Sequence, residues 1–200
     1  MIMGVVLAGG QATRMGGGDK GLRCVAGKTL LAHVLDRLTP QVDAVALNAN
    51  GDPSRFDRFA LPVVPDTVPD FPGPLAGILA GMDWGAGQGA SHIVTVAADT
   101  PFFPRDLVCR LDAAAGASGL AVAATRRDGR VQRHPTFGLW PVALRDDLRA
   151  ALVGGCRKVS VWVDRHHGRV AEFDTHPFDP FFNINTPHDQ SVAAELAGRQ

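Results

Sequence analysis

The chain has 200 residues, a length suited to one domain that buries about 70% of the surface its unfolded chain exposes. Twenty acidic residues balance twenty basic ones, which argues against bulk binding to nucleic acid or to an anionic membrane surface. Three widely spaced cysteines argue against a disulfide framework and indicate a reducing compartment. Without an apolar run near the ~20 residues of a membrane helix or a cleavable leader, we expect a cytoplasmic protein.

The chain opens with an apolar, β-branched run, Met1 to Ala8, that is typical of a strand buried on both faces. The run stops at glycine, and five glycines lie between residues 9 and 18. Glycine lets successive peptide N–H groups turn into one concavity that binds phosphate oxygens. Arg14 and Lys20 add fixed positive charge. The stretch therefore predicts a loop that wraps a polyphosphate at the carboxyl end of the first strand.

Other interpretations of this loop fit less well. Residues 16–21 match the dinucleotide fingerprint G-x-G-x-x-G, but the first glycine stands about eight residues too late after the strand. A P-loop needs Ser or Thr after its lysine, and here Gly21 follows Lys20. A surface loop without function would rarely combine so many glycines with two cations directly after a buried strand.

Beyond the loop, predicted helices and strands alternate. Helices are expected at residues 28–38, in a short turn from Asp52-Pro53, and at 75–82, 104–111, 144–152 and from Pro187 onward, with Thr186 as the cap. The glycines of 85–89 are expected to break the third of these. Strands are expected at residues 42–47, 62–65, 93–98, 120–124, 134–140 and 170–173. Residues 157–167 fit either a strand or a helix.

This alternation predicts the α/β class: a single-domain, Rossmann-like, open and mostly parallel sheet with helices on both faces. No linker separates two domains. Residues 1–125 carry the regular alternation and should bind the nucleotide. Residues 126–200 are less regular and should add mixed strands and a wall that faces a second substrate.

The ends of parallel strands meet at one crevice, where open α/β sheets bind ligands. The residues at these ends are Leu7, Ala8, Gly9, Gly10, Asn48, Asp66 and Asp99. Asp99 follows an apolar run and precedes Thr100-Pro101, so its carboxylate suits Mg²⁺ on phosphate oxygens, or else caps a turn. Asn48 could contact the base or ribose of a nucleotide, or it could form a turn at the end of the strand, and the sequence favours neither role.

The predicted catalytic set is Arg14, Lys20 and Asp99. The two cations would neutralise a triphosphate and the charge that develops at the attacked phosphorus. In-line transfer at phosphorus depends mostly on positioning and electrostatics. The sequence offers no Ser/His/Asp arrangement that would indicate other chemistry.

Three segments of the first loop, Leu7 to Gly10, Arg14 to Gly17 and Asp19 to Leu22, resemble the signature of nucleotidyltransferases that activate small phosphorylated molecules. In this form they are similar to molybdenum cofactor guanylyltransferases, which join GMP from GTP to molybdopterin. The resemblance continues in order through most of the chain. The later segments that carry it are Asn48, Asp66, residues 72–77, Asp99, residues 134–136 and residues 183–187.

The resemblance implies GTP as substrate and Mg²⁺ as cofactor, with Asp99 as the metal ligand. The implied GTP contacts are Leu7, Ala8, Gly9, Gly10, Lys20, Asn48, Asp66 and Asp99. Relatives that use CTP tend to have Leu-Ala-Ala-Gly, so the two glycines favour guanine. Asp66 could accept hydrogen bonds from the guanine N1–H and amino group.

For the second substrate, molybdopterin, the implied contacts are Gly73, Gly77, Arg157, Lys158, Asn183 and Asn185. Lys158 departs from the paired arginines of relatives and lacks their bidentate fork. Asn185 serves equally well as a cap of the last helix. The basic stretch from Arg126 to His134 would line a pterin opening, or form an exposed turn.

We therefore expect GMP transfer from GTP to molybdenum-loaded molybdopterin, with pyrophosphate released, by a monomer. Proteins that insert molybdenum or mature molybdoenzymes are the implied partners. The alternatives are the same chemistry with CTP or a sugar phosphate, a GTP-binding handover module without catalysis, and, more distantly, an NAD-dependent dehydrogenase.

Overall fold

A computed structural model describes residues 1–9, 19–68 and 73–197. Its main sheet has seven strands in the order β5-β4-β1-β6-β8-β7-β9. The strands are β1 (Ile2–Leu7), β4 (Val45–Asn48), β5 (Val63–Val64), β6 (His92–Ala97), β7 (Ala121–Arg127), β8 (Arg130–Pro141) and β9 (Arg169–Phe173). Only β8 runs antiparallel to its neighbours among these strands. The predicted open, mostly parallel sheet is confirmed.

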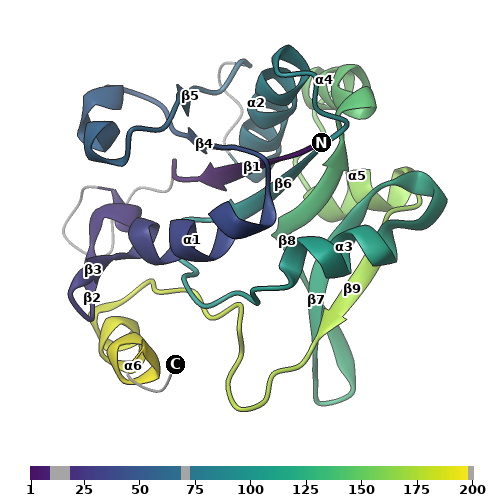
Figure 1. Ribbon diagram of the computed structural model, residues 1–200. Helices are drawn as coiled ribbons and strands as arrows, with labels where there is room; N and C mark the ends of the chain where they lie inside the picture. The colour runs from purple at the N-terminus through teal and green to yellow at the C-terminus, as the bar shows by residue number, and fades with distance from the viewer. Residues whose placement is uncertain (10–18, 69–72, 198–200) are drawn as a thin grey trace.

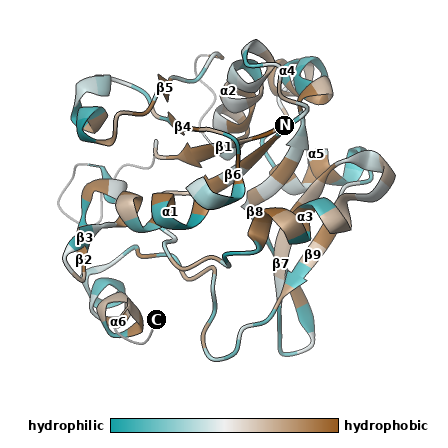
Figure 2. Ribbon diagram, viewed as in Figure 1, coloured by the Kyte–Doolittle hydropathy of each residue, from teal (hydrophilic) through white to brown (hydrophobic). Residues whose placement is uncertain are grey.

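Helices cover both faces of the sheet (Figure 1). The helices α1 (Leu30–Leu38) and α3 (Leu107–Ala115) lie on one face. The other face carries α2 (Pro74–Gly87), α4 (Arg145–Val153) and α5 (Val159–Arg165). Alternate residues of β1 serve the two layers, with Val6 in the first core and Val5 in the second. Figure 2 shows apolar residues along β1 and β6 and polar residues at the far end of the β7–β8 hairpin.

Smaller elements connect this frame. They are the 3-10 turns η2 (Lys20–Leu22), η3 (Thr39–Gln41), η4 (Pro53–Phe59), η5 (Gly116–Ser118) and η6 (Val142–Leu144), and the ribbon of β2 (Cys24–Val25) with β3 (Lys28–Thr29). The last helix, α6 (Pro187–Ala197), lies beside that ribbon, away from the sheet (Figure 1). Thr186 Oγ1 accepts from Asp189 N at 3.1 Å, which confirms the predicted cap.

The helix expected at residues 104–111 begins at Leu107, and the strand expected at residues 42–47 begins at Val45. Three further element predictions differ from the structure for reasons that the packing explains. The first helix begins at Leu30, because Thr29 caps it and Lys28 pairs into the ribbon. Residues 120–124 and 134–140 extend into one hairpin around the predicted polar turn. The third predicted helix runs through Gly85 to Gly87, since Gly85 packs on the sheet: a Cβ there would stand 2.7 Å from Ile93 Cγ2.

Residues 159–165, within the segment that the sequence left open, form a helix. Val159, Trp162 and Val163 are buried, at helical spacing, while Val161 is 56% exposed. A strand would have buried Val161 with its neighbours Val159 and Val163 on one face. Seven residues are too few to tell a helical from a strand periodicity in the sequence. The packing of this segment against Trp140 and α4 decides for the helix.

Residues 1–125 and 126–200 share one sheet, because β8 inserts between β6 and β7. The functional division at residue 125 stays a prediction. Cys24, Cys109 and Cys156 are free thiols, as expected. No helix in the described ranges has the length and apolar character to cross a membrane.

We predict that Thr95→Val lowers the free energy of unfolding by about 1–3 kcal/mol. Thr95 is fully buried; its hydroxyl donates to Thr136 O at 2.8 Å and accepts from Trp140 Nε1 at 2.9 Å. Valine fills the space but leaves the indole N–H without a partner. Urea unfolding followed by Trp fluorescence measures the loss, and unchanged stability would contradict this account of the sheet centre.

Candidate nucleotide and second-substrate site

A cleft of about 460 Å³ opens at the carboxyl ends of β1, β4 and β6. Its described lining comes from the first loop, the ends of the parallel strands, β8, the start of α2 and the segment before α6. The lining residues are Leu7, Ala8, Gly9, Lys20, Gly21, Asn48, Asn50, Asp66, Gly73, Pro74, Ala97, Ala98, Asp99, Thr136 and Asn183. The structure thus brings together most of the predicted strand-end residues at one edge of the sheet.

Lys20 stands where three segments of the chain meet. Its ammonium donates to Asn185 Oδ1 at 2.6 Å and lies 3.3 Å from Asp99 Oδ2. The side chains of Lys20 and Asp99 are only 22% and 18% exposed, so their attraction is less screened than that of a surface pair. The first loop, the end of β6 and the C-terminal segment are joined by one cation.

Asp99 is held from its other side by a buried hydroxyl. Thr100 Oγ1 lies 2.7 Å from Asn183 Oδ1 and 3.2 Å from Asp99 Oδ1, and it has a single hydrogen to donate. The backbone adds a third link, because Ile184 N donates to Asp99 O at 2.9 Å. These contacts fix the predicted metal ligand and the two asparagines of the C-terminal segment as one unit.

At the opposite end of the cleft, Asp66 accepts on both carboxylate oxygens. Asn48 Nδ2 donates to Oδ1 at 2.9 Å, and Asn50 Nδ2 donates to Oδ2 at 2.8 Å. Asn50 Oδ1 also accepts from Asp66 N at 2.8 Å. Each carboxylate oxygen keeps a lone pair for a further donor. Asp66 is therefore a fixed acceptor whose remaining capacity faces the cleft.

Asn48 serves mainly to orient Asp66. Its amide nitrogen donates to Val64 O at 3.1 Å as well as to Asp66, so both of its hydrogens are engaged. Its Oδ1 turns toward α2, where a Cβ on Gly77 would stand only 2.3 Å away. Gly77 does not line the cleft; it leaves room for Asn48. Whether either residue touches a ligand stays a prediction.

Among the second-substrate predictions, Gly73 and Asn183 line the cleft. Asn185 bonds Lys20 through its side chain, so it is not the helix cap. Arg157 and Lys158 lie between α4 and α5 and do not line the cleft, and their role as contacts stays a prediction. Gly10 and Arg14 lie outside the described residues.

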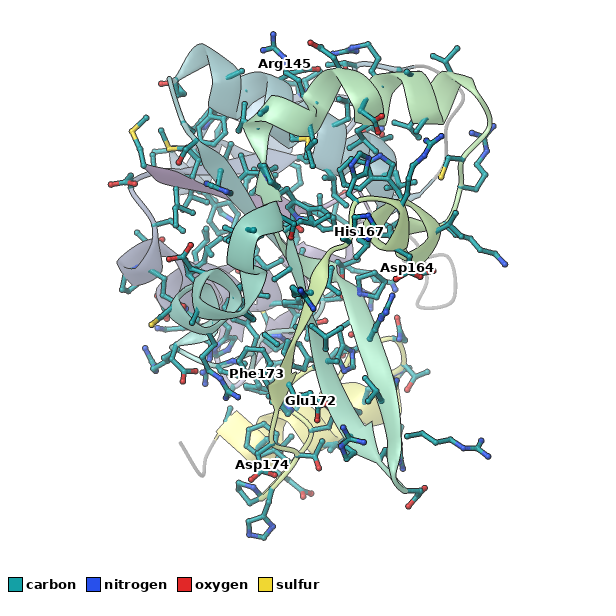
Figure 3. All side chains as sticks on the ribbon, turned by 90° about the vertical axis from the view of Figure 1, so that its right-hand side faces the viewer. Arg145, Asp164, His167, Glu172, Phe173 and Asp174 are labelled. Carbon is teal, nitrogen blue, oxygen red and sulfur yellow. The ribbon has the colours of Figure 1, made fainter. Side chains whose placement is uncertain are left out.

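The basic stretch of the β7–β8 hairpin is partly neutralised. Arg126 pairs with Glu172 at 2.6 Å and Arg133 with Asp164 at 2.6 Å. Figure 3 faces this edge of the sheet and labels both acids.

His134, on the same hairpin, stacks on Phe181 and forms a hydrogen bond with Thr125 Oγ1 at 2.9 Å. Burial lowers the pKa of His134, with the charge of Asp179 offsetting part of this effect. Neutral His134 packs the hairpin against the segment that carries Asn183.

The site that the sequence predicts lacks three residues: Asn50, Thr100 and Arg55. Asn50 follows the predicted strand end by two residues, a spacing that places it on the same side as Asn48 and was a usable signal. Thr100 stands next to Asp99 but acts through Asn183, a partner 83 residues away. Arg55 pairs with Asp19 across the fold, and no local pattern announces that contact.

Residues 4–170 match the family model of the MobA-like NTP transferase domain. A molybdenum cofactor guanylyltransferase of Bradyrhizobium sp. (strain ORS 278) is 52% identical over 202 residues, covering 100% of this chain and 94% of the relative. A second molybdenum cofactor guanylyltransferase, from Rhodopseudomonas palustris (strain BisB5), is 52% identical over 198 residues, covering 98% of this chain and 93% of the relative. In fold, the chain is similar to molybdopterin-guanine dinucleotide biosynthesis protein A from Archaeoglobus fulgidus, with a TM-score of 0.72, 23% identity and full coverage of both chains.

We predict that Gly77→Ala weakens binding of GTP, the ligand expected from the sequence, by tenfold or more. The new methyl group would displace the Asn48 side chain and with it the support of Asp66. Gly87→Ala is the matched control, because it changes the same helix where a Cβ meets nothing within 4 Å. Titration with a fluorescent GTP analogue measures both; equal affinities of the two variants would refute the role assigned to Gly77.

Proposed function

Since this chain belongs to the MobA-like NTP transferase family and, by its close relatives, to the molybdenum cofactor guanylyltransferases, we propose that it transfers GMP from GTP to molybdenum-loaded molybdopterin and releases pyrophosphate. The observation that carries the proposal is the contact of Lys20 with Asp99 and Asn185, where Lys20 and Asp99 line a cleft at the ends of parallel strands. An ammonium ion and a carboxylate at this place suit a phosphate chain and its counter-ion.

In this proposal the base of GTP lies at the Asp66 end of the cleft. Asp66 is oriented by Asn48 and Asn50, and its free lone pairs suit the N1–H and amino group of guanine. Cytosine presents no such pair of donors. The Cβ-free backbone at Gly9 leaves space beside the nucleotide, since a Cβ there would meet nothing within 4 Å.

The triphosphate then extends toward Lys20. Lys20 would neutralise charge at the attacked phosphorus, together with Arg14 from the first loop. The attacking group is the terminal phosphate of molybdopterin, which is already anionic, so the reaction needs no protein base. The chain's contribution is to align two phosphates in line and to stabilise the charge that develops between them.

The donor set of the cleft fits Mg²⁺. Mg²⁺ uses one or two carboxylates plus phosphate oxygens and waters, so Asp99 alone suffices as a protein ligand. Carboxylates also outnumber cations among the described lining residues, which makes a triphosphate there dependent on an added cation. When bound, the metal ion would neutralise phosphate charge, and the Asp99 carboxylate would hold it.

Molybdopterin would approach from the side of residues 183–185. Asn183 and Gly73 line that part of the cleft, and Asn185 holds Lys20 between the two substrates. Arg157 and Lys158 are proposed as more distant contacts. We also propose that the chain acts as a monomer in the cytoplasm. Its partners would be proteins that insert molybdenum and proteins that mature molybdoenzymes.

We predict that Lys20→Ala and Asp99→Ala each lower turnover by about 10²–10³ or more, because each removes a charge that the transition state needs. The assay measures pyrophosphate released from GTP with Mg²⁺ and molybdenum-loaded molybdopterin, with CTP and ATP as competing substrates. Lys28→Ala is the control, since its ion pair with Asp36 is exposed. Near-normal turnover in folded Lys20→Ala or Asp99→Ala, or faster release from CTP, would overturn the assignment.

A further inference from the structure

Arg55, on η4, connects two ends of the cleft without lining it. Its Nε lies 2.7 Å from Asp19 Oδ2, and its Nη2 donates to Asn50 O at 2.5 Å. Its Nη1 donates to the carbonyl oxygen of Asp52. The guanidinium thus forms an ion pair with the Asp19 carboxylate and donates hydrogen bonds to two backbone carbonyls of the loop before η4.

One partner of Arg55, Asp19, is distant in sequence and the other, Asn50, lies in the preceding loop; each is connected to residues of the site. Asp19 immediately precedes Lys20, whose ammonium meets Asp99 and Asn185. Asn50 bonds both the carboxylate and the backbone N–H of Asp66. One planar guanidinium therefore ties the backbone beside the phosphate-binding lysine to the residue that orients the proposed base acceptor.

The setting of Arg55 distinguishes it from a solvated surface arginine. Its side chain is 26% exposed, that of Asp19 is 21% exposed, and the guanidinium lies 4.7 Å from the ring centre of the buried Phe56. Arg58 offers a direct comparison on the same turn. It lies 4.9 Å from the ring centre of Phe59, yet its side chain is exposed and has no ion pair among those of the described residues.

We propose that Arg55 is a positioning residue that couples the phosphate end of the nucleotide site to its base end. The coupling acts through Asp19 on Lys20 and through Asn50 on Asp66. The proposal rests on the proposed guanylyl transfer, because it assigns the two ends to the phosphates and the guanine of GTP. Arg55 itself touches neither substrate.

The two attachments predict two different losses. Without the ion pair to Asp19, the lysine that meets the phosphates is less well placed, and affinity for GTP falls. Without the bond to the Asn50 carbonyl, Asp66 is less well fixed, and the preference for GTP over ATP falls. Lysine at position 55 would keep the positive charge toward Asp19 but lose the fork that reaches both partners, so it should preserve affinity better than selectivity.

The test is a double-mutant cycle on nucleotide binding by the full chain. Dissociation constants for GTP and ATP are measured by calorimetry for the wild type, Arg55→Ala, Asp19→Asn and the double variant. Residues in direct contact couple by factors of about 2 to 100, so Arg55→Ala should raise the GTP constant about tenfold, and the double variant should lose little more. Arg58→Ala, which removes an arginine from an aromatic ring of the same turn, should stay within about twofold.

Selectivity and thermal unfolding separate positioning from general support. A positioning role predicts a lower GTP-to-ATP ratio in Arg55→Ala at a melting temperature close to that of Arg58→Ala. Should Arg55→Ala not fold, Arg55→Lys takes its place in the cycle, with reduced selectivity expected. Wild-type affinity and selectivity in the folded Arg55 variant, or strictly additive losses with Asp19→Asn, would overturn the inference. Absence of GTP binding by the wild type would instead overturn the proposed function.

Discussion

The site depends on one partly buried contact, in which the ammonium of Lys20 lies between Asp99 and Asn185. These residues come from the start, the middle and the end of the chain. A charge-assisted hydrogen bond and a half-buried ion pair give each segment a defined place at the sheet edge. The buried Thr100 hydroxyl and the Ile184 backbone bond extend the same constraint to Asn183.

The sheet makes this contact possible by ending its parallel strands at one edge. Ala8 N bonds Asn48 O, and Ala98 N bonds Leu7 O, so the ladders continue past the strands to the residues of the site. The glycines of α2 let that helix lie close to β1 and β4. Core packing therefore sets the position of Asn48, and through it the orientation of Asp66.

The sequence carried the parts of this arrangement that are local. An apolar run followed by glycine indicates the end of a buried strand. An acidic residue at such an end indicates the edge of the sheet that binds ligands, and for this reason Asp66 and Asp99 could be predicted. Contacts between residues far apart in the sequence could not be predicted in this way. The ion pair of Arg55 with Asp19 and the hydrogen bond of Thr100 to Asn183 form only because distant segments pack together. Residue spacing along the chain does not indicate which distant segments will do so. Gly85 misled for the same reason, because its role is close contact with the sheet, and α2 ends only at Gly87.

The most direct test of the central claim is a crystal structure of the chain with GTP and Mg²⁺. We expect the triphosphate between Gly9 and Lys20, the metal ion on Asp99, and the guanine within hydrogen-bonding distance of Asp66. A nucleotide bound away from these residues, or a metal ion that Asp99 does not contact, would contradict it.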